Sequence, residues 1–171
     1  MKKILFILAI LFSQFSYSQV APQLEYVCEL YIQLDPALVV GETTHGIRRI
    51  IPIVGGNVNG PQIKGEVLKG GADWQVLRKD GNTELEAQYQ FRTDDGVLIY
   101  IHNVGVRLAT PEIAARLGRG EQVDPSQYYF RTLPRFEAPV QSRYAWLNDA
   151  IFICKGERLA NSVKLRVWKL L

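Results

Sequence analysis

The sequence predicts an all-β protein, a closed or nearly closed antiparallel β-barrel of about eight to ten strands with one short capping helix. Three observations predict this class: apolar and polar residues alternate over several runs, turn residues separate the runs at short intervals, and one stretch carries helix signals. Period-two alternation is typical of half-buried strands, and evenly spaced short strands are typical of sandwiches and barrels. Closure into a barrel would also remove exposed sheet edges.

An export signal is predicted ahead of the barrel. Two lysines give the chain a positive start, residues 4–12 form an apolar run, and cleavage is predicted after Ser18. The run is too short to cross a bilayer as a helix. We therefore expect residues 1–18 to be a signal peptide and residues 19–171 to form a single domain in the periplasm or outside the cell.

The predicted mature chain is close to electrically neutral. The sequence has 20 basic and 17 acidic residues, and loss of the two signal lysines reduces the net charge from +3 to +1. Such a balance argues against a nucleic acid as partner. Cys28 and Cys154 both lie in apolar stretches. Export permits a disulfide between them, and the alternative is two buried free thiols.

The strands follow from the alternation in chain order. The longest alternating run covers residues 24–34, and two others cover residues 85–92 and 163–168. Shorter β-rich runs lie at residues 48–54, 63–68, 74–78, 97–102, 128–131 and 150–154. Asp80-Gly81-Asn82 and Asp95-Gly96 are predicted hairpin turns, because glycine tolerates a positive φ and aspartate bonds its own backbone.

One helix is predicted within residues 110–127, an insertion that we expect to cap one end of the sheet. Thr110 can cap the helix, and Pro111 suits its first position. Glu112 complements the positive end of the helix dipole, and Gly118 is predicted to end the helix. No repeat or linker interrupts the chain, so one domain is predicted.

No metal site and no cofactor are predicted. His45 and His102 lie far apart in the sequence, and neither has a cysteine or carboxylate at ligand spacing. The chain also has no phosphate-binding loop and no nucleophile-elbow motif. Any chemistry would therefore depend on ordinary polar side chains.

Three polar clusters are candidates for a functional site. The first, residues 43–49, enters a strand and includes Arg48, and its alternative interpretation is a solvated loop. The second, residues 70–74, places Asp73 beside Trp74 after two glycines. Asp73 either satisfies turn amides or lies in an apolar setting that raises its pKa and suits proton transfer.

The third cluster contains Arg131, Glu137, Tyr144, Trp146 and Asn148. The last three alternate, so we expect them on one side of a strand. They would form either a ligand-binding wall oriented by the Asn148 amide or a core strand whose polar tips find internal partners.

Blocks of sequence in a fixed order resemble the family called domain of unknown function 3237. They include GGADW at residues 70–74, YQFRTDDGVLIYI at residues 89–101 and RYAWLN at residues 143–148, and the resemblance covers about residues 24–171. It implies a compact antiparallel barrel with a central pocket, broadly similar to allene oxide cyclase and calycin barrels, and no general activity. By resemblance, the candidates to line that pocket are Arg48, Asp73, Trp74, Arg92, Arg131, Glu137, Tyr144, Trp146 and Asn148.

Three functions are compatible with the sequence. The preferred hypothesis is an exported barrel that binds an apolar or aromatic small molecule, whose acidic group would pair with Arg48 or Arg131. The alternative is a cofactor-free isomerase, cyclase or lyase with Asp73 or Glu137 as general acid/base, arginines that stabilise negative charge and indole rings that exclude water. The third is a filled barrel with a structural role. The sequence leaves enzymatic activity and oligomeric state open.

Overall fold

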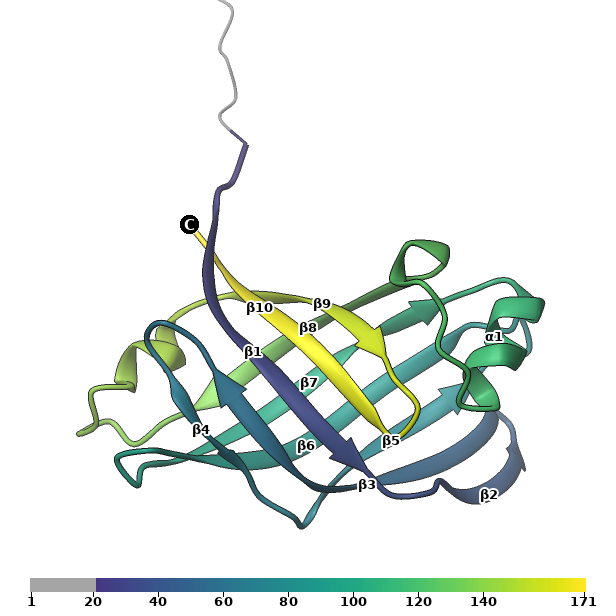
Figure 1. Ribbon diagram of the computed structural model, residues 1–171, viewed down its shortest axis with the longest axis horizontal. Coiled ribbons are helices and arrows are strands. Elements are labelled where there is room, and N and C mark those ends of the chain that lie inside the picture. Colours follow the sequence, from purple (N-terminus) through teal and green to yellow (C-terminus); the bar gives the residue numbers. More distant parts are fainter. Residues whose placement is uncertain (1–20) are drawn as a thin grey trace, which may run out of the picture.

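Ten antiparallel strands make up most of the computed structural model, which describes residues 21–171 (Figure 1). The predicted signal peptide, residues 1–18, lies outside the described residues. In chain order the strands are β1 (Leu24–Leu34), β2 (Leu38–Thr43), β3 (Gly46–Asn59), β4 (Lys64–Val67), β5 (Gly71–Leu77), β6 (Thr83–Thr93), β7 (Leu98–Leu108), β8 (Tyr129–Glu137), β9 (Phe152–Arg158) and β10 (Ser162–Leu170).

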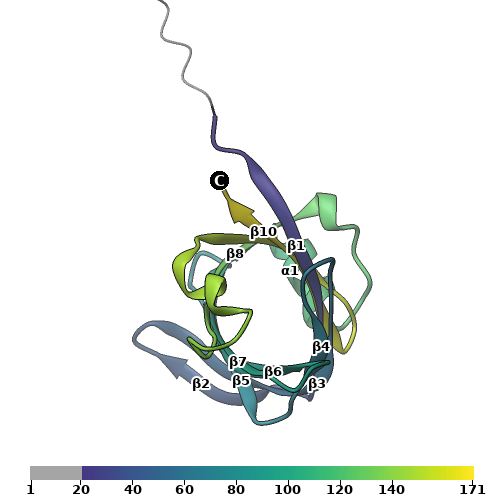
Figure 2. The same ribbon diagram turned by 90° about the vertical axis from the view of Figure 1, so that its left-hand side faces the viewer.

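The sheet closes on itself, as the sequence predicted. Strands β1, β10, β9, β8, β7 and β6 are neighbours in that order, and β1 also pairs with β3. Both β4 and β5 bridge β3 and β6, so they share one place in the wall. The result is an eight-stranded barrel, seen end-on in Figure 2, with two extra strands. The β2 strand lies outside the ring and pairs with β3.

The alternation along β6 is confirmed, whereas that along β1 is interrupted. Leu85, Tyr89 and Phe91 of β6 are buried at spacings of two or four residues. A bulge between Tyr26 and Cys28 shifts the register of β1, so that Val27 is also buried and Tyr26 is exposed. A bulge adds one residue to a strand and reverses the faces beyond it, and the spacing of apolar residues does not reveal this.

The predicted helix caps one end of the barrel. It runs as α1 (Pro111–Gly118), and its first turn is capped by Thr110, whose hydroxyl accepts a hydrogen bond from the Ile113 N–H at 3.3 Å. Ile113 and Leu117 pack into the core, and the chain turns away through Gly120 at a φ of +78°. Two short 3₁₀ helices complete the described secondary structure, η1 (Pro125–Gln127) and η2 (Ala145–Asp149).

The prediction of a strand through residues 144–148 is wrong, because this segment is the η2 turn at the barrel end opposite α1. Tyr144 and Leu147 are the buried members, and their separation of three residues matches a 3₁₀ repeat. Figures 1 and 2 show this segment lying over the end of the ring.

The two cysteines are buried free thiols. Cys28 of β1 and Cys154 of β9 are both register partners of Val167 on β10, which lies between them. Two strand spacings separate them by about 10 Å, beyond the reach of a disulfide. Burial raises the pKa of each thiol to about 12, which keeps both protonated.

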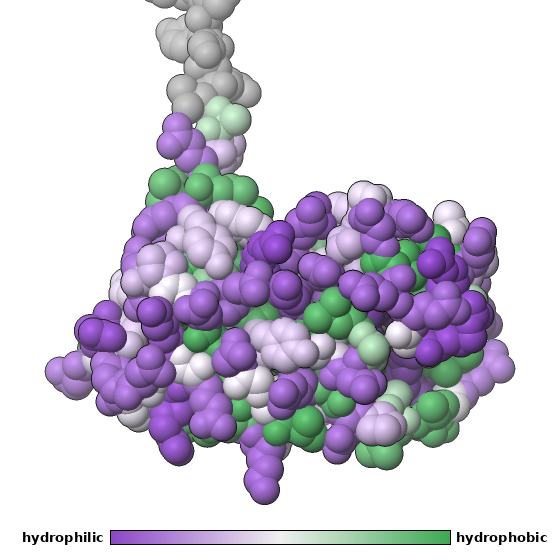
Figure 3. Space-filling view, viewed as in Figure 1, coloured by the Kyte–Doolittle hydropathy of each residue, from purple (hydrophilic) through white to green (hydrophobic). Residues whose placement is uncertain are grey.

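On the face of the molecule seen in Figure 3, polar and apolar side chains are mixed. Leu38, Val39 and Val40 on β2 are among the exposed apolar residues. Within residues 21–171, no helix has the length and apolar character needed to cross a membrane.

Candidate functional site

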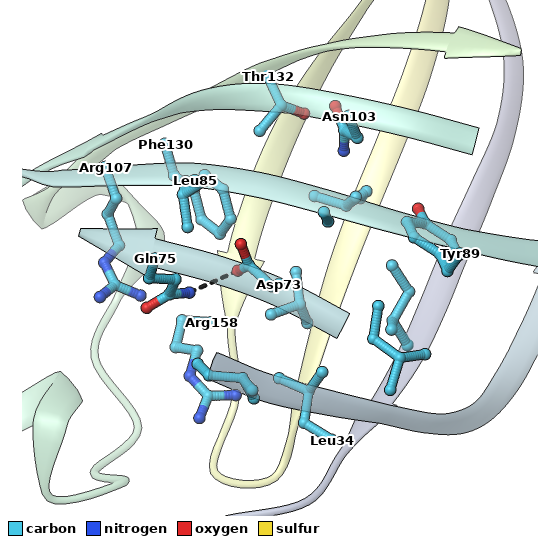
Figure 4. Close-up of a pocket in the computed structure, with 16 residues that line it drawn as sticks. Leu34, Asp73, Gln75, Leu85, Tyr89, Asn103, Arg107, Phe130, Thr132 and Arg158 are labelled. Carbon is cyan, nitrogen blue, oxygen red and sulfur yellow. Dashed lines mark hydrogen bonds between the residues drawn. The ribbon is translucent and has the colours of Figure 1, made fainter. Parts of the chain in front are cut away.

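A cavity of about 40 Å³ lies inside the barrel, toward the α1 end (Figure 4). Inward-facing residues of β1, β3 and β5–β10 form its wall. Most of the lining is apolar, with Ile32, Ile51, Leu85 and Phe130 as examples. The cavity has room for about three water-sized groups. The polar side chains that enter it therefore determine what the barrel can bind.

Asp73 is held in this cavity by a chain of hydrogen bonds. Gln75 Nε2 donates to Asp73 Oδ2 at 2.5 Å, and the Glu86 backbone N–H donates to Oδ1 at 3.1 Å. The Gln75 oxygen in turn accepts from Arg49 Nε and Nη2 at 2.9 and 2.7 Å. Gln75 is thus oriented on both sides and fixes the position of the carboxylate.

The pKa of Asp73 is raised, because burial penalises its charged form. Hydrogen bonds from Gln75 and from the Glu86 backbone oppose the rise, as do the positive charges of Arg107 and Arg49. Desolvation outweighs all of them. The carboxyl group therefore exchanges its proton closer to neutral pH than an ordinary aspartate does.

Three arginines gather around Asp73. Arg107 on β7 is only 8% exposed, and burial together with the charges of Arg49 and Arg158 lowers its pKa to about 10. The pKa values of Arg49 and Arg158 are also lowered, mainly by burial. Figure 4 shows Arg107, Gln75 and Arg158 grouped at one end of the cavity.

These three guanidinium groups have few partners. Arg158 Nη1 donates to the Ser162 carbonyl at 2.9 Å, and Arg107 Nη2 reaches the Thr83 hydroxyl only at 3.5 Å. None of the three forms an ion pair within 4.0 Å among residues 21–171. Their positive charge is therefore poorly neutralised.

An outer hollow of about 270 Å³ adjoins the cavity at the α1 end. The two spaces share Leu34, Ile51, Arg107 and Arg158. Arg49, Arg119 and Leu117 of α1 also line the outer hollow. Together the two spaces carry four arginines but only two carboxylates, Asp35 and Asp73. Arg119 is paired with Glu121 at 2.6 Å, so the arginines of the combined site without an ion pair among the described residues are Arg49, Arg107 and Arg158. We call the combined site the arginine mouth.

The predicted site residues do not converge, and of them only Asp73 lines the cavity. Arg48 and Trp74 face the outer wall, where Arg48 Nη1 donates to the Trp74 carbonyl at 3.0 Å. The reason is the strand period of two residues: Asp73 points inward, so its neighbour Trp74 points outward. On β3 the inward arginine is Arg49 rather than Arg48.

Arg92, Arg131 and Glu137 also lie away from the cavity. Arg92 and Glu137 are exposed, and the Arg131 guanidinium carbon lies 4.9 Å from the centre of the Tyr129 ring on the outside. Phe130 and its alternate neighbours on β8 are buried, so the odd-numbered residues of that strand face solvent.

Tyr144, Trp146 and Asn148 close the opposite end of the barrel. The Tyr144 hydroxyl donates to Asp95 Oδ1 at 2.9 Å, and Trp146 packs against the core. The Asn148 amide accepts from the Ala138 N–H and donates to the Ala138 carbonyl, at 2.8 and 2.9 Å. These contacts hold the three residues in the end cap, away from the cavity.

The missed residues carry a signal in the sequence. Arg49 lies two residues before the buried Ile51, Arg107 lies four residues after the buried Asn103, and Arg158 lies four residues after the buried Cys154. Each arginine thus continues the inward-facing set of its strand. Among the described residues, no group of three or more His, Cys, Asp or Glu side chains is arranged to hold a metal ion.

Known proteins share both the sequence and the fold. A UPF0311 protein of Rhodopseudomonas palustris is 44% identical over 152 residues, which cover 88% of this chain and 99% of that protein. A UPF0311 protein of Clostridium acetobutylicum is 42% identical over 147 residues, covering 85% of this chain and 92% of that protein.

Solved structures of other proteins have a similar fold. A conserved protein of unknown function from R. palustris superposes with a TM-score of 0.84 at 41% identity, covering 90% of this chain and 99% of its own. A β-barrel-like protein from Acinetobacter baumannii gives a TM-score of 0.77 at 36% identity, with 91% and 99% covered. An enzyme from Penicillium herquei gives 0.67 at 20% identity, with 90% and 97% covered, a likeness of fold alone.

The family model described as protein of unknown function (DUF3237) matches residues 22–170, which is nearly every residue that the structure describes. The resemblance drawn from the GGADW and RYAWLN blocks is thereby confirmed. The chain belongs to the DUF3237 family.

Proposed function

We propose that this protein binds a small organic anion in the arginine mouth. The observation that carries the proposal is the set of three inward-facing arginines, Arg49, Arg107 and Arg158, which have no ion pair within the described chain. Burying a cation is costly unless it is paired. A carboxylate between two guanidinium groups would supply that pairing through charge-assisted hydrogen bonds.

The apolar part of the site supports a ligand with an apolar body. Leu34 and Ile51 line both spaces, and Leu117 of α1 faces the outer hollow. Binding sites for small molecules commonly combine apolar walls with a few polar groups that fix orientation. The acidic group that the sequence analysis assigned to Arg48 or Arg131 is reassigned to the inward arginines.

Calorimetry with matched probes tests this proposal. Benzoate and cinnamate are expected to bind, whereas the uncharged benzyl alcohol is not. Arg158→Gln is expected to weaken benzoate binding at least tenfold. Arg135→Gln removes the same charge from an exposed position on the outer wall and should leave binding unchanged. Equal binding of benzyl alcohol, an unaffected Arg158→Gln variant, or no binding of either acid would each overturn the proposal.

A second candidate function, proton transfer without a cofactor, is supported by the raised pKa of Asp73. The Asp73 carboxylate would remove a proton from the carbon next to a carbonyl group, and the arginines would stabilise the resulting enolate. The protonated Asp73 would then donate that proton to the enolate oxygen, which gives the enol, or to carbon. This is the isomerase form of the alternative expected from the sequence.

Enolisation of phenylpyruvate, followed by ultraviolet absorbance, tests the catalytic candidate. Acceleration by the wild type that Asp73→Asn abolishes, while benzoate still binds, would support it. If the wild type does not accelerate enolisation, or if Asp73→Asn is as fast, Asp73 is not a general base for this reaction.

An export location is proposed on the N-terminal sequence, which lies outside the described residues. An organic-anion binder outside the cytoplasm would meet its ligand directly from the surroundings.

A further inference from the structure

Three buried polar groups in the interior cavity have no nitrogen or oxygen hydrogen-bond partner. They are the Tyr89 hydroxyl, the Asn103 side-chain oxygen and the Thr132 hydroxyl, on side chains that are 1%, 3% and 3% exposed. The Thr132 hydroxyl has the Cys154 thiol as its neighbour, and a thiol is a weak hydrogen-bond partner. Among residues 21–171 these are the buried side-chain polar atoms that remain unpaired. All three residues line the cavity that holds Asp73.

The occurrence of all three unpaired polar groups in one cavity requires an explanation. Buried polar groups in native proteins are nearly always paired, because an unpaired donor or acceptor loses its hydration without compensation. Apolar residues such as Ile101 and Phe136 occupy equivalent inward positions on β7 and β8, so the barrel can be filled without polar atoms. The three groups are therefore best explained as contacts for a ligand.

The structure assigns to the inner cavity a subsite that recognises a hydroxyl group, so we propose that the bound anion is a hydroxy acid. This inference rests on the proposed anion-binding function. A hydroxyl group both donates and accepts hydrogen bonds. It can donate to the Asn103 oxygen and accept from the Thr132 or Tyr89 hydroxyl. The Asp73 carboxyl in the same layer and the apolar walls around it disfavour a second negative charge at that depth.

The strand register sets the spacing between the two ends of the ligand. Asp73, Ala87 and Asn103 are cross-strand neighbours and form one layer of the barrel. Tyr89 lies two residues deeper on β6, whereas Thr132, the register partner of Gly105, lies two residues nearer the outer hollow. Gln75, whose side chain holds the Arg49 guanidinium group, lies two residues from Asp73 toward the outer hollow. Two residues along a strand span about 7 Å.

That spacing favours a hydroxyl group opposite the carboxylate across an aromatic ring over one next to the carboxylate. Among simple aromatic acids, 4-hydroxybenzoate has this arrangement. Salicylate carries its hydroxyl beside the carboxylate, which places it at the level of Thr132 but short of Asn103 and Tyr89. The inner volume of about 40 Å³ suits the hydroxyl end of such a ring, with the rest of the ring nearer the outer hollow.

Calorimetric titration of benzoate, salicylate and 4-hydroxybenzoate tests the subsite. The wild type is expected to bind 4-hydroxybenzoate at least tenfold more tightly than benzoate or salicylate. Tyr89→Phe and Thr132→Val keep the side-chain shape and are expected to reduce this preference, the ratio of the two dissociation constants, at least threefold. Asn103→Leu is expected to abolish it. Tyr100→Phe is the matched control, because its hydroxyl bonds Gln88 Oε1 on the outer wall at 3.1 Å.

The outcomes separate the two proposals. If none of the three acids binds, the anion-binding function fails and the subsite with it. If all three bind equally, or if the three inner variants keep the wild-type preference, the anion site stands and the hydroxyl subsite is overturned. If salicylate is preferred, the spacing derived from the register is wrong and the inner subsite is also overturned.

Discussion

Replacing Arg107 by methionine is expected to stabilise the ligand-free protein while destroying anion binding. The fall of the Arg107 pKa to about 10 corresponds to a destabilisation of about 3 kcal/mol at neutral pH, because each pKa unit is worth about 1.4 kcal/mol. Methionine follows the aliphatic part of arginine and removes the buried charge. That figure already includes the attraction between Arg107 and Asp73. Loss of the contact with the Thr83 hydroxyl offsets about 1 kcal/mol of the gain, which leaves a net stabilisation of about 2 kcal/mol.

Urea denaturation at pH 7 measures this change directly. A gain of about 2 kcal/mol raises the melting temperature by about 4–8 °C in a chain of this size. Arg135→Met, at an exposed position on β8, should change stability by less than about 0.5 kcal/mol. If Arg107→Met lowers the free energy of unfolding while Arg135→Met does not, Arg107 supports the fold and the interpretation of a strained, ligand-seeking cation is refuted.

Three further predictions concern pH, thiol chemistry and export. Binding of benzenesulfonate, which stays ionised, should tighten as pH falls through the raised pKa of Asp73, because protonation removes a competing negative charge. The Asp73→Asn variant should bind benzenesulfonate without that pH dependence. Identical pH profiles for the wild type and Asp73→Asn would exclude this mechanism. Because its pKa is raised in the folded protein, Asp73 contributes its full stabilisation below its unfolded-state pKa of about 4 and loses it as pH rises through its folded-state pKa. Asp73→Asn should therefore make the free energy of unfolding less dependent on pH over that range. Cys28 and Cys154 should resist a thiol reagent such as Ellman's in the native protein and both react in urea, whereas a mass two daltons lower would indicate a disulfide. Expression in a Gram-negative host should yield a protein whose N-terminus is Gln19, and an intact Met1 in the purified protein would count against the signal peptide.

The barrel could be predicted from sequence because its determinants are local. Alternation over residues 85–92 and the Asp95-Gly96 turn fix a hairpin without reference to the rest of the chain. The bulge near Val27 and the 3₁₀ turn at Ala145–Asp149 could not be predicted in the same way. Both depend on how the strand or segment meets neighbours that are distant in sequence.

The candidate site was harder to predict, because local motifs were given more weight than strand parity. Arg48 and Arg49 are adjacent and chemically identical, and only the direction of each side chain distinguishes wall from interior. Arg107 and Arg158 stand at the ends of strands, where the sequence shows a charged residue beside a turn. Their convergence follows from closure of the ring, which brings the ends of β3, β7 and β9 around one opening.

The distribution of ion pairs argues that the interior arginines serve a ligand. On the outer wall some cations are paired: Arg166 Nε lies 3.1 Å from Glu29, and Arg143 Nε lies 3.1 Å from Asp95. Others, such as Arg92 opposite Glu66, have no ion pair within residues 21–171, but water solvates their charge. In the arginine mouth the cations outnumber the carboxylates, although desolvation makes an unpaired charge most costly there. Arginines at exposed positions would keep the protein equally soluble without the cost of burying an unpaired charge. The charge at the mouth is therefore best explained by an anionic ligand that completes the site.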